Sequence, residues 1–312
     1  MFRPRIAVTV GDPRGIGPEV VAKALAADLP PASIVAIGPA PLIEALPAAE
    51  SISVGEAGPV AARSESGTAL TLDVTPEHAG LSVRACIEAA VRMALAGEVH
   101  AVVTGPADKR ALHLAGIRHP GHTEWLAELA GGIEVAMMLV AGGLRVVLIT
   151  THLPLRDVPD AVTASRIVAT GHLTRRALDE WWGIEDPRLA LCALNPHAGD
   201  GGLFGTEDDD VLAPAAAQLD AAGPFPADTV FVRALRGEFD AVLVPSHDVG
   251  MTAVKVAGFG TGVNVTLGLP FIRTAPDHGT ALDIAGQGIA QAGSIAEAVR
   301  LAITLARRRA GS

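Results

Sequence analysis

Short runs of β-branched and apolar residues, alternating with amphipathic stretches, are the feature that most constrains how this chain can fold. The runs with the length and composition of buried strands are residues 5–10, 33–37, 99–103, 145–150, 188–194, 240–244 and 263–267. The stretches with helical apolar spacing or helix-end signals are residues 81–96, 207–219 and 294–309. This alternation favours the α/β class with a largely parallel sheet.

Length and composition exclude several classes of protein. A chain of 312 residues predicts one large or two medium domains, and 49% apolar residues exclude a long disordered chain. The net charge of −10 argues against nucleic acid as the main partner, because phosphate backbones need a basic surface. The longest membrane candidate, residues 135–150, is interrupted by Gly142, Gly143 and Arg145, so no membrane span is expected.

Cysteine usage and the first residues of the chain indicate the cellular compartment. Cys86 and Cys192 both lie in apolar periodic segments, which is typical of buried thiols in a reducing cytoplasm. The opening sequence MFRPRIAVTV is stopped by Gly11, Asp12 and Pro13, and it fits a first strand better than a signal peptide. We therefore expect a cytoplasmic protein.

Three histidines share one position relative to the predicted strands. His152, His197 and His247 each follow the carboxyl end of a strand by one to three residues. Ligands of open α/β sheets bind at that edge. Neutral imidazoles brought together there would hold one divalent ion and leave coordination positions open for substrate. Taken singly, each histidine is also compatible with an ordinary loop residue.

Other polar loops have the composition of an anion site. The turn from Gly11 to Glu19 is neither a dinucleotide fingerprint nor a P-loop, and by itself indicates only a tight strand-to-helix turn. Gly121, His122 and Thr123 open a helix whose amides, imidazole and hydroxyl could bind phosphate. Lys255, Asn264 and Arg273 lie among apolar residues, where either an anionic substrate or internal ion pairs would account for them.

Ordered motifs then identify a family that the chain resembles. They are GDPRGIGPEV, TGPADK, GHTEWLAE, LITTHLPLRDVPDAVT, LNPHAGDGGLFG, PADTVF and VNVTLGLPFIRTAPDHGTALDIAG. Together they closely resemble the 4-hydroxythreonine-4-phosphate dehydrogenase family of pyridoxal phosphate synthesis, including its phospho-threonate and phospho-erythronate dehydrogenase relatives. The resemblance runs from the N-terminus to about Gly288.

The resemblance implies a fold and a domain division. HGTALDIAG, starting at His278, is similar to the adenine-side cofactor loop of isocitrate and isopropylmalate dehydrogenases. We therefore expect two α/β/α domains around a cleft, not a Rossmann domain. The expected division is 1–125 with 281–312 for the first domain and 126–280 for the second. A homodimer with a shared active site is also implied.

Residue roles follow from the same resemblance. The implied metal ligands are His152, His197 and His247, holding one divalent ion per subunit (zinc, cobalt, magnesium or manganese). The implied substrate contacts are His122, Thr123, Lys255, Asn264 and Arg273. The implied contacts to NAD or NADP are His278, Gly279, Thr280 and Asp283. Lys255 and Asp228 are the candidates for moving protons during catalysis.

The implied reaction is metal-dependent, NAD(P)-linked oxidation and decarboxylation of 4-phosphohydroxy-L-threonine to 3-amino-2-oxopropyl phosphate. Val249, Val256 and Ala257 depart from the polar residues usual in the family, so 4-phospho-threonate, 4-phospho-erythronate and a terephthalate dihydrodiol are alternative substrates. The histidines and phosphate loops alone would also suit a metal-dependent hydrolase or a phosphosugar-binding protein. The HGTALDIAG loop favours the dehydrogenase, because neither alternative needs an adenine site.

Overall fold

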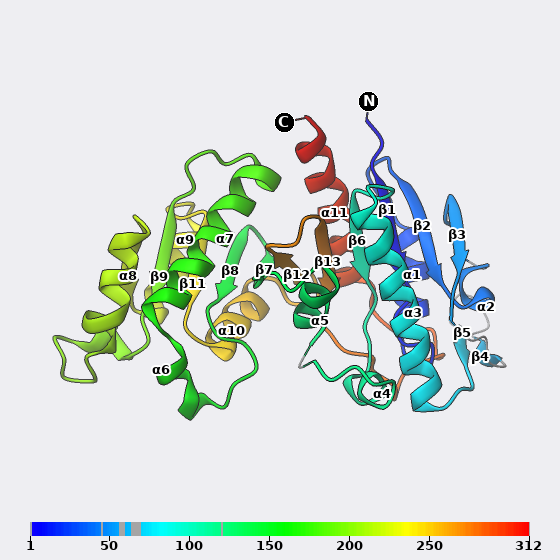
Figure 1. The fold of residues 1–312 in the computed structure, drawn as a ribbon, viewed down its shortest axis with the longest axis horizontal. Coiled ribbons are helices and arrows are strands. Elements are labelled where there is room, and N and C mark those ends of the chain that lie inside the picture. The colour runs from blue at the N-terminus through cyan, green and yellow to red at the C-terminus, as the bar shows by residue number, and fades with distance from the viewer. Residues whose placement is uncertain (1, 45, 56–59, 64–69, 120, 312) are drawn as a thin grey trace. The chain divides into compact units, whose positions relative to one another are not determined.

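A computed structural model describes residues 2–44, 46–55, 60–63, 70–119 and 121–311 (Figure 1). The chain divides into unit 1, Met1–Ile133 with Leu269–Gly311, and unit 2, Glu134–Gly268. The sequence-based division differs, because it assigns residues 126–133 and 269–280 to the second domain, whereas both stretches belong to unit 1. Residues 269–280 contain strand β13 (Ile272–Pro276), which pairs in parallel with β6 (Ala101–Thr104) of unit 1.

Unit 1 is built on a parallel sheet of strand order β13-β6-β1-β2-β3. Its other strands are β1 (Arg5–Thr9), β2 (Ser33–Gly38) and β3 (Glu50–Ser53), and β4 (Val60–Arg63) pairs separately with β5 (Leu70–Leu72). Its helices are α1 (Gly17–Leu25), α2 (Ala40–Ile43), α3 (Pro76–Leu95), α4 (Lys109–Leu114), α5 (His122–Leu129) and α11 (Gly293–Gly311).

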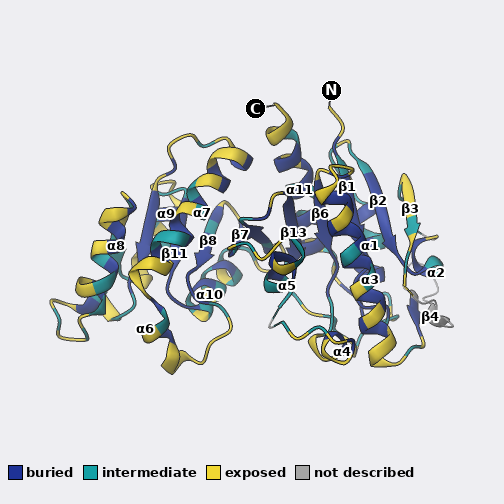
Figure 2. Ribbon diagram, viewed as in Figure 1, coloured by how far each residue is buried: buried dark blue, intermediate teal, exposed yellow. Residues whose placement is uncertain are grey.

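The core of unit 1 lies around β1, whose Ile6, Ala7 and Val8 are fully buried because helices cover the sheet (Figure 2). Helix α3 packs against β1, β2 and β6, and α11 packs against β6 and β13. The start of α3 is set locally, since the Thr75 hydroxyl accepts a hydrogen bond from the His78 amide. Continuous apolar strands of this kind are expected in a parallel sheet covered on both faces.

Unit 2 contains a mixed sheet of strand order β10-β9-β11-β8-β7-β12. Its strands are β7 (Ala136–Ala141), β8 (Leu144–Leu148), β9 (Leu189–Cys192), β10 (Ala222–Phe225), β11 (Ala241–Val244) and β12 (Val263–Leu267). Its helical segments are residues Leu155–Asp157, α6 (Val158–Ala161), α7 (Ala164–Trp182), Pro196–Gly199, Asp208–Leu212, α8 (Ala213–Gln218), α9 (Ala227–Leu235) and α10 (His247–Gly258).

The expected largely parallel pairing forms within each unit, with strand β7 of unit 2 as the exception. Strands β8, β11, β9 and β10 are parallel, but β7 is antiparallel to both β8 and β12. Gly142 and Gly143 turn the β7–β8 hairpin with φ values of 55° and 90°, a combination that favours glycine. The same two glycines are those that the sequence analysis found to interrupt the apolar run at 135–150, and the structure places β7 before them and β8 after them.

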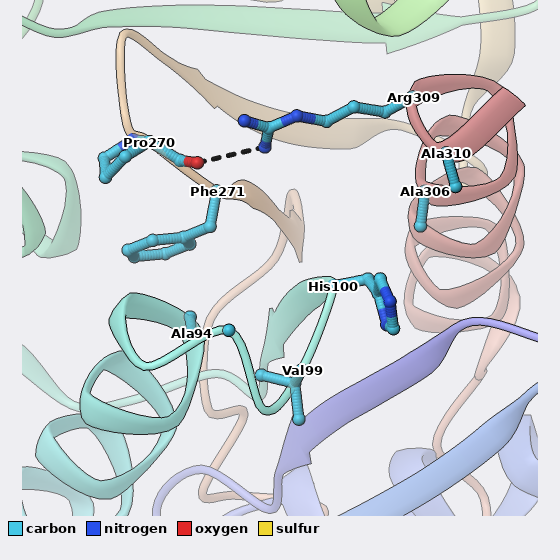
Figure 3. Close-up of a pocket in the computed structure, with 9 residues that line it drawn as sticks. Ala94, Val99, His100, Pro270, Phe271, Ala306, Arg309 and Ala310 are labelled. Atoms are coloured by element: carbon cyan, nitrogen blue, oxygen red, sulfur yellow. Dashed lines mark hydrogen bonds between the residues drawn. The ribbon is translucent and has the colours of Figure 1, made fainter. Parts of the chain in front are cut away.

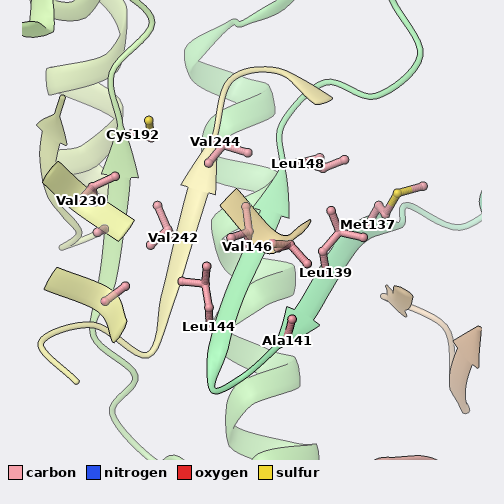
Figure 4. Close-up of a cluster of buried hydrophobic side chains, with 13 residues drawn as sticks. Met137, Leu139, Ala141, Leu144, Val146, Leu148, Cys192, Val230, Val242 and Val244 are labelled. Atoms are coloured by element: carbon pink, nitrogen blue, oxygen red, sulfur yellow. The ribbon is translucent and has the colours of Figure 1, made fainter. Parts of the chain in front are cut away.

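One face of the unit 2 sheet carries a hydrophobic cluster that α9 and α10 cover (Figure 4). Its buried members are Met137, Leu139, Ala141, Leu144, Val146, Leu148, Ala190, Cys192, Val230, Ala234, Val242, Val244 and Val254. The strand members alternate along each strand, as side chains on one face of a pleated sheet do. This packing fixes the strand ends from which the polar loops of unit 2 emerge.

The predicted α/β class is confirmed, and each predicted strand forms with small shifts at its ends. Strands β3, β4, β5, β7, β10 and β13 were not predicted as separate strands. In β13 a buried arginine breaks the apolar pattern, and β10 contains Gly223 and Pro224, so neither matches the usual strand signal. Among the helices of the described residues, none has the length and apolar character needed to cross a membrane.

Candidate active site

The three histidines singled out by the sequence follow three neighbouring parallel strands of unit 2. His152 follows β8, His247 follows β11 and His197 follows β9, and β11 lies between the other two strands. Adjacent strands lie ~4.8 Å apart, so their carboxyl ends form one short edge. The imidazole rings of His152 and His247 have centroids 5.6 Å apart. The fold therefore brings these two side chains together.

His247 is oriented by its own helix. It is the first residue of α10, and its Nδ1 lies 2.8 Å from Oδ1 of Asp248. In the tautomer that carries its proton on Nδ1, this proton is donated to the carboxylate, and Nε2 keeps a lone pair for a metal ion. A carboxylate partner on the other ring nitrogen is the usual arrangement for a histidine that ligates a metal.

His197 lies in a left-handed turn that a buried carboxylate supports. His197, Ala198 and Asp200 have φ values of 54°, 56° and 44°, a region that costs free energy for residues other than glycine. The start of this loop is fixed by Asp208, which is 1% exposed and accepts hydrogen bonds from the backbone amides of Leu194 and Asn195 at 2.8 and 2.9 Å.

The complete three-histidine site stays a prediction. Within the described part of this single chain, no group of three or more His, Cys, Asp or Glu side chains is arranged to hold a metal ion. His152 and His197 are exposed and His247 is half-buried, so all three rings are accessible from outside the chain.

The remaining predicted residues of unit 2 are dispersed over three elements. Lys255 lies on α10, two turns beyond His247, with Nζ 5.9 Å from the centroid of the Phe259 ring. Asn264 is on β12, and its buried Oδ1 has no hydrogen-bond partner among the described residues. Asp228 is exposed in the first turn of α9.

Cys192 is excluded as a nucleophile by its surroundings. Burial, followed by the negative charges of Asp208 and Asp228, raises the pKa of its thiol to about 12. A thiol with such a pKa remains protonated and unreactive at neutral pH. Cys192 therefore packs as a small apolar residue of the unit 2 core.

Unit 1 contains a buried cationic cluster with properties that suit an anion. Arg273 on β13 is 3% exposed, and its Nη2 donates a 2.6 Å hydrogen bond to Oγ1 of Thr104 at the end of β6. Burial lowers the pKa of Arg273 to about 10, whereas the carboxylate of Glu124 acts in the opposite direction. The guanidinium therefore stays charged at neutral pH.

His122 is a neutral hydrogen-bonding group beside that charge. Burial, then the positive charges of Arg273 and Lys109, lowers the pKa of His122 to about 3. Its Nε2 is buried and has no partner within the described chain. Thr123 is buried next to it in the first turn of α5, where backbone amides point toward the helix start. This set of donors around one buried arginine is suited to a phosphate group.

An ion-pair network, which the sequence analysis did not find, joins two of the family-like motifs in unit 1. Arg14 contacts Oδ2 of the fully buried Asp12 at 2.7 Å and Oδ2 of Asp108 at 3.1 Å. The hydrogen bond to Asp12 raises the pKa of Arg14 despite partial burial. Only the three-dimensional contact between the loops after β1 and β6 reveals it, because residues 12 and 108 are far apart in the sequence.

The predicted cofactor residues lie in the segment after β13. Thr280 accepts a backbone hydrogen bond from Ile16 at 2.9 Å, and Asp283 is exposed. Nε2 of His278 is buried and has no partner among the described residues. A Cβ added at Gly279 would meet no atom within 4 Å. The segment thus combines an unsatisfied polar atom, an exposed carboxylate and open space, which suit a bound nucleoside.

The three apolar departures from the family pattern have different surroundings. Val249 and Ala257 are half-buried and pack against the hydrophobic cluster of unit 2. Val256 is 84% exposed on α10. Packing against the core accounts for the apolar character of residues 249 and 257. Their departure from the family's polar residues is therefore weak evidence for a different substrate.

A separate pocket of about 280 Å³ lies in unit 1 (Figure 3). It is lined by the ends of α3 and α11 and by Val99, His100, Pro270 and Phe271, which precede β6 and β13. These residues are at the amino ends of the strands. Ligands of parallel sheets bind at the carboxyl ends, so this pocket is not part of the candidate active site.

Comparisons with known proteins agree over nearly the whole chain. A family model described as pyridoxal phosphate biosynthetic protein PdxA matches residues 20–302. The chain is 43% identical to the 4-hydroxythreonine-4-phosphate dehydrogenase of Burkholderia vietnamiensis, with 99% of this chain and 98% of the relative covered.

Two solved structures are similar in fold. A 4-hydroxythreonine-4-phosphate dehydrogenase from Klebsiella pneumoniae has a TM-score of 0.82 at 38% identity, covering 97% of this chain and 99% of the other. A terephthalate 1,2-cis-dihydrodioldehydrogenase from Burkholderia xenovorans has a TM-score of 0.68 at 29% identity, with 97% and 98% covered.

Proposed function

The chain belongs to the PdxA family of pyridoxal phosphate biosynthetic proteins, and on that basis we propose that it is a 4-hydroxythreonine-4-phosphate dehydrogenase. The proposed reaction is the oxidation and decarboxylation of 4-phosphohydroxy-L-threonine to 3-amino-2-oxopropyl phosphate. The observation that carries this proposal is the placement of His152, His247 and His197 after three neighbouring parallel strands. A hydrolase or a binding protein is less favoured, since the relatives are named dehydrogenases.

A divalent metal ion fits the histidine edge of unit 2. The donors are imidazole nitrogens, and the contact of His247 Nδ1 with Asp248 leaves Nε2 as the nitrogen available for a metal. Three such ligands add no negative charge, so a bound ion keeps its Lewis acidity and can lower the pKa of a substrate hydroxyl. Zinc and cobalt suit imidazole best, and magnesium or manganese remain candidates.

The cationic cluster of unit 1 is proposed to bind the substrate phosphate. Arg273 supplies the positive charge, the neutral His122 and Thr123 supply hydrogen bonds, and Thr104 orients the guanidinium. Lys255 and Asn264 in unit 2 are the further proposed substrate contacts. This set favours a phosphorylated hydroxyacid over the unphosphorylated terephthalate diol, with 4-phospho-threonate and 4-phospho-erythronate as the alternatives.

A nicotinamide cofactor fits the segment that starts at His278. Three features of the segment support contacts to the adenosine half: the unpartnered Nε2 of His278, the exposed Asp283 and the open space beside Gly279. Thr280 is the fourth proposed contact. A nicotinamide cofactor bound there would supply the acceptor for the hydride lost from the substrate carbon. NAD and NADP are both compatible with these residues.

Two protons must move in the proposed reaction. The substrate hydroxyl loses its proton as the hydride leaves, and after loss of CO2 the carbon that carried the carboxylate takes up a proton. Lys255 and Asp228 are the residues proposed to exchange these protons with the substrate. Replacing Lys255 by Met or Asp228 by Asn and measuring hydride transfer apart from CO2 release separates the two roles.

We propose a homodimer whose metal site draws on both subunits. Large apolar side chains are exposed on the unit 2 segments that carry the histidines and Lys255: Leu155, Leu203, Val256 and Phe259 are 77%, 72%, 84% and 82% exposed. Large apolar side chains exposed to this extent are often covered by a partner chain. The two buried free cysteines are compatible with the proposed cytoplasmic location.

The test is a substrate panel with the metal-loaded protein. We expect NADH or NADPH and CO2 to form from 4-phosphohydroxy-L-threonine, activity to disappear with a chelator, and zinc or cobalt to restore it. Gln variants of His152, His197 and His247 should each lose both activity and stoichiometric metal. Turnover of the terephthalate diol above every phosphorylated compound would overturn the substrate assignment, and absence of cofactor reduction with all compounds would overturn the dehydrogenase.

A further inference from the structure

The segment between β13 and α11, residues 277–292, contains no helix or strand. Ala281, Gly286 and Gly288 have positive φ values of 38°, 75° and 77°. Hydrogen bonds within it include Gln287 Nε2 to the Asp283 carbonyl at 2.8 Å. A loop of this length without regular structure keeps one conformation only if contacts from elsewhere offset its conformational entropy.

The far end of this segment is held by an ion pair on α1. Glu19 is 1% exposed, and its Oε1 lies 2.7 Å from Nζ of Lys23, one helical turn later. The same Oε1 accepts a hydrogen bond from the Ala290 amide at 2.8 Å. Lys23 Nζ donates to the carbonyls of Gly288 and Ala290, both at 2.8 Å. The charged groups of the pair therefore contact the loop backbone directly.

The near end of the segment is held by the turn that precedes α1. The Ile16 amide donates to the Thr280 carbonyl at 2.9 Å. A Cβ added at Gly15 would lie 2.7 Å from that same carbonyl, so glycine permits the close approach. The GDPRGIGPE motif thus contacts the segment at two points, and the exposed Asp283 lies between them.

We propose that the Glu19–Lys23 pair is a positioning device that holds residues 278–290 in the conformation that binds the adenosine half of the cofactor. This inference rests on the proposed cofactor role of His278–Gly286. Neither side chain needs to touch the cofactor, because the pair acts through the backbone at 288–290. The motif that the sequence alone described as a tight turn then has a function, which is to preorganise the cofactor loop.

The expected effect of losing the pair follows from preorganisation. A loop that must be ordered on binding reduces affinity by the cost of that ordering. Three charge-assisted hydrogen bonds join the pair to the loop, so we expect Lys23→Met to weaken NAD binding about tenfold. The KM for the phosphorylated substrate and kcat should change by less than about twofold, because the substrate contacts lie elsewhere.

The experiment measures the Kd of NAD by calorimetry on the metal-loaded protein without turnover, together with deuterium exchange of the peptides covering 278–290. Lys23→Met leaves Glu19 buried without its charge partner and is therefore expected to destabilise unit 1. The double variant Glu19→Gln/Lys23→Met removes both charges and is used alongside it. Both variants are expected to exchange faster at 278–290 and to bind NAD more weakly.

A matched control is available in the same unit. Arg84 and Glu88 form an exposed ion pair of the same spacing and the same 2.7 Å distance on α3, away from the loop. Glu88→Gln/Arg84→Met should leave both NAD affinity and exchange at 278–290 unchanged. If both double variants weakened NAD binding equally, loss of any helix ion pair would account for the effect, and the Glu19–Lys23 pair would have no specific positioning role.

The outcomes distinguish this inference from the proposed function. If wild type binds NAD, Asp283→Ala weakens that binding, and both Lys23 variants bind NAD as tightly as wild type, the positioning role is wrong and the cofactor site stands. If Asp283→Ala leaves NAD affinity unchanged, the loop is not the cofactor site and both proposals fail. Equal losses of NAD and substrate affinity in the Lys23 variants would also overturn the positioning role.

Discussion

His122 of unit 1, whose Nε2 is buried, makes a quantitative prediction about acid stability. The pKa of His122 is about 3 in the folded protein, because of burial and of the charges of Arg273 and Lys109. In the unfolded chain a histidine titrates near 6.5. The folded form therefore stays neutral while the unfolded chain takes up a proton as the pH falls below 6.5. The contribution to stability is fully present above that pH and is lost progressively toward pH 3.

The magnitude follows from the same two values. Each pH unit below 6.5 favours the unfolded chain by about 1.4 kcal/mol, which gives about 2 kcal/mol at pH 5. The His122 residue is half-buried as a whole, although its Nε2 is inaccessible, so we expect about 1–2 kcal/mol. His122→Gln removes this titration while keeping a polar side chain.

The assay is the free energy of opening of the β1 amides, measured by native-state hydrogen exchange at pH 8 and pH 5 in buffer without phosphate. Wild type should lose about 1–2 kcal/mol more than His122→Gln between the two pH values. His113→Gln, on the exposed side of α4, serves as the matched control and should behave as wild type. Equal pH losses in wild type and His122→Gln would refute the reasoning.

Three further predictions concern packing and backbone geometry. In urea unfolding, Gly11→Ala should destabilise unit 1 by about 1–3 kcal/mol more than Gly97→Ala does. Both glycines have positive φ, but a Cβ added at Gly11 would clash with the carbonyl oxygen of Pro106, whereas a Cβ added at Gly97 would meet no atom within 4 Å. Asp208→Asn should cost about 1–3 kcal/mol and lower the metal affinity, since one backbone amide of the His197 loop loses its acceptor. Val249→Gln should cost about 1–3 kcal/mol by placing an amide against the core, whereas Val256→Gln on the exposed surface should stay within about 0.5 kcal/mol; equal costs would contradict the packing explanation.

The strand-and-helix pattern could be read from the sequence because it depends on local properties. Apolar β-branched runs form strands wherever both faces are buried, and β1 and β11 show this in residues such as Val8 and Val242. The position of His152, His197 and His247 just after such runs was readable for the same reason. Strand β13 was missed because its Arg273 is charged, and its hydrogen bond to Thr104 and the nearby carboxylate of Glu124 help to stabilise a buried arginine there.

The arrangement of these elements was decided by tertiary structure. No local signal encodes that β11 lies between β8 and β9, which is what places His247 beside His152. The same holds for the contact of Glu19 with Ala290, which joins residues from opposite ends of the chain. Local propensity determines whether a segment forms a strand or a helix. Which strands pair, and which groups surround a buried charge, depends on how distant segments pack, and therefore on the whole chain.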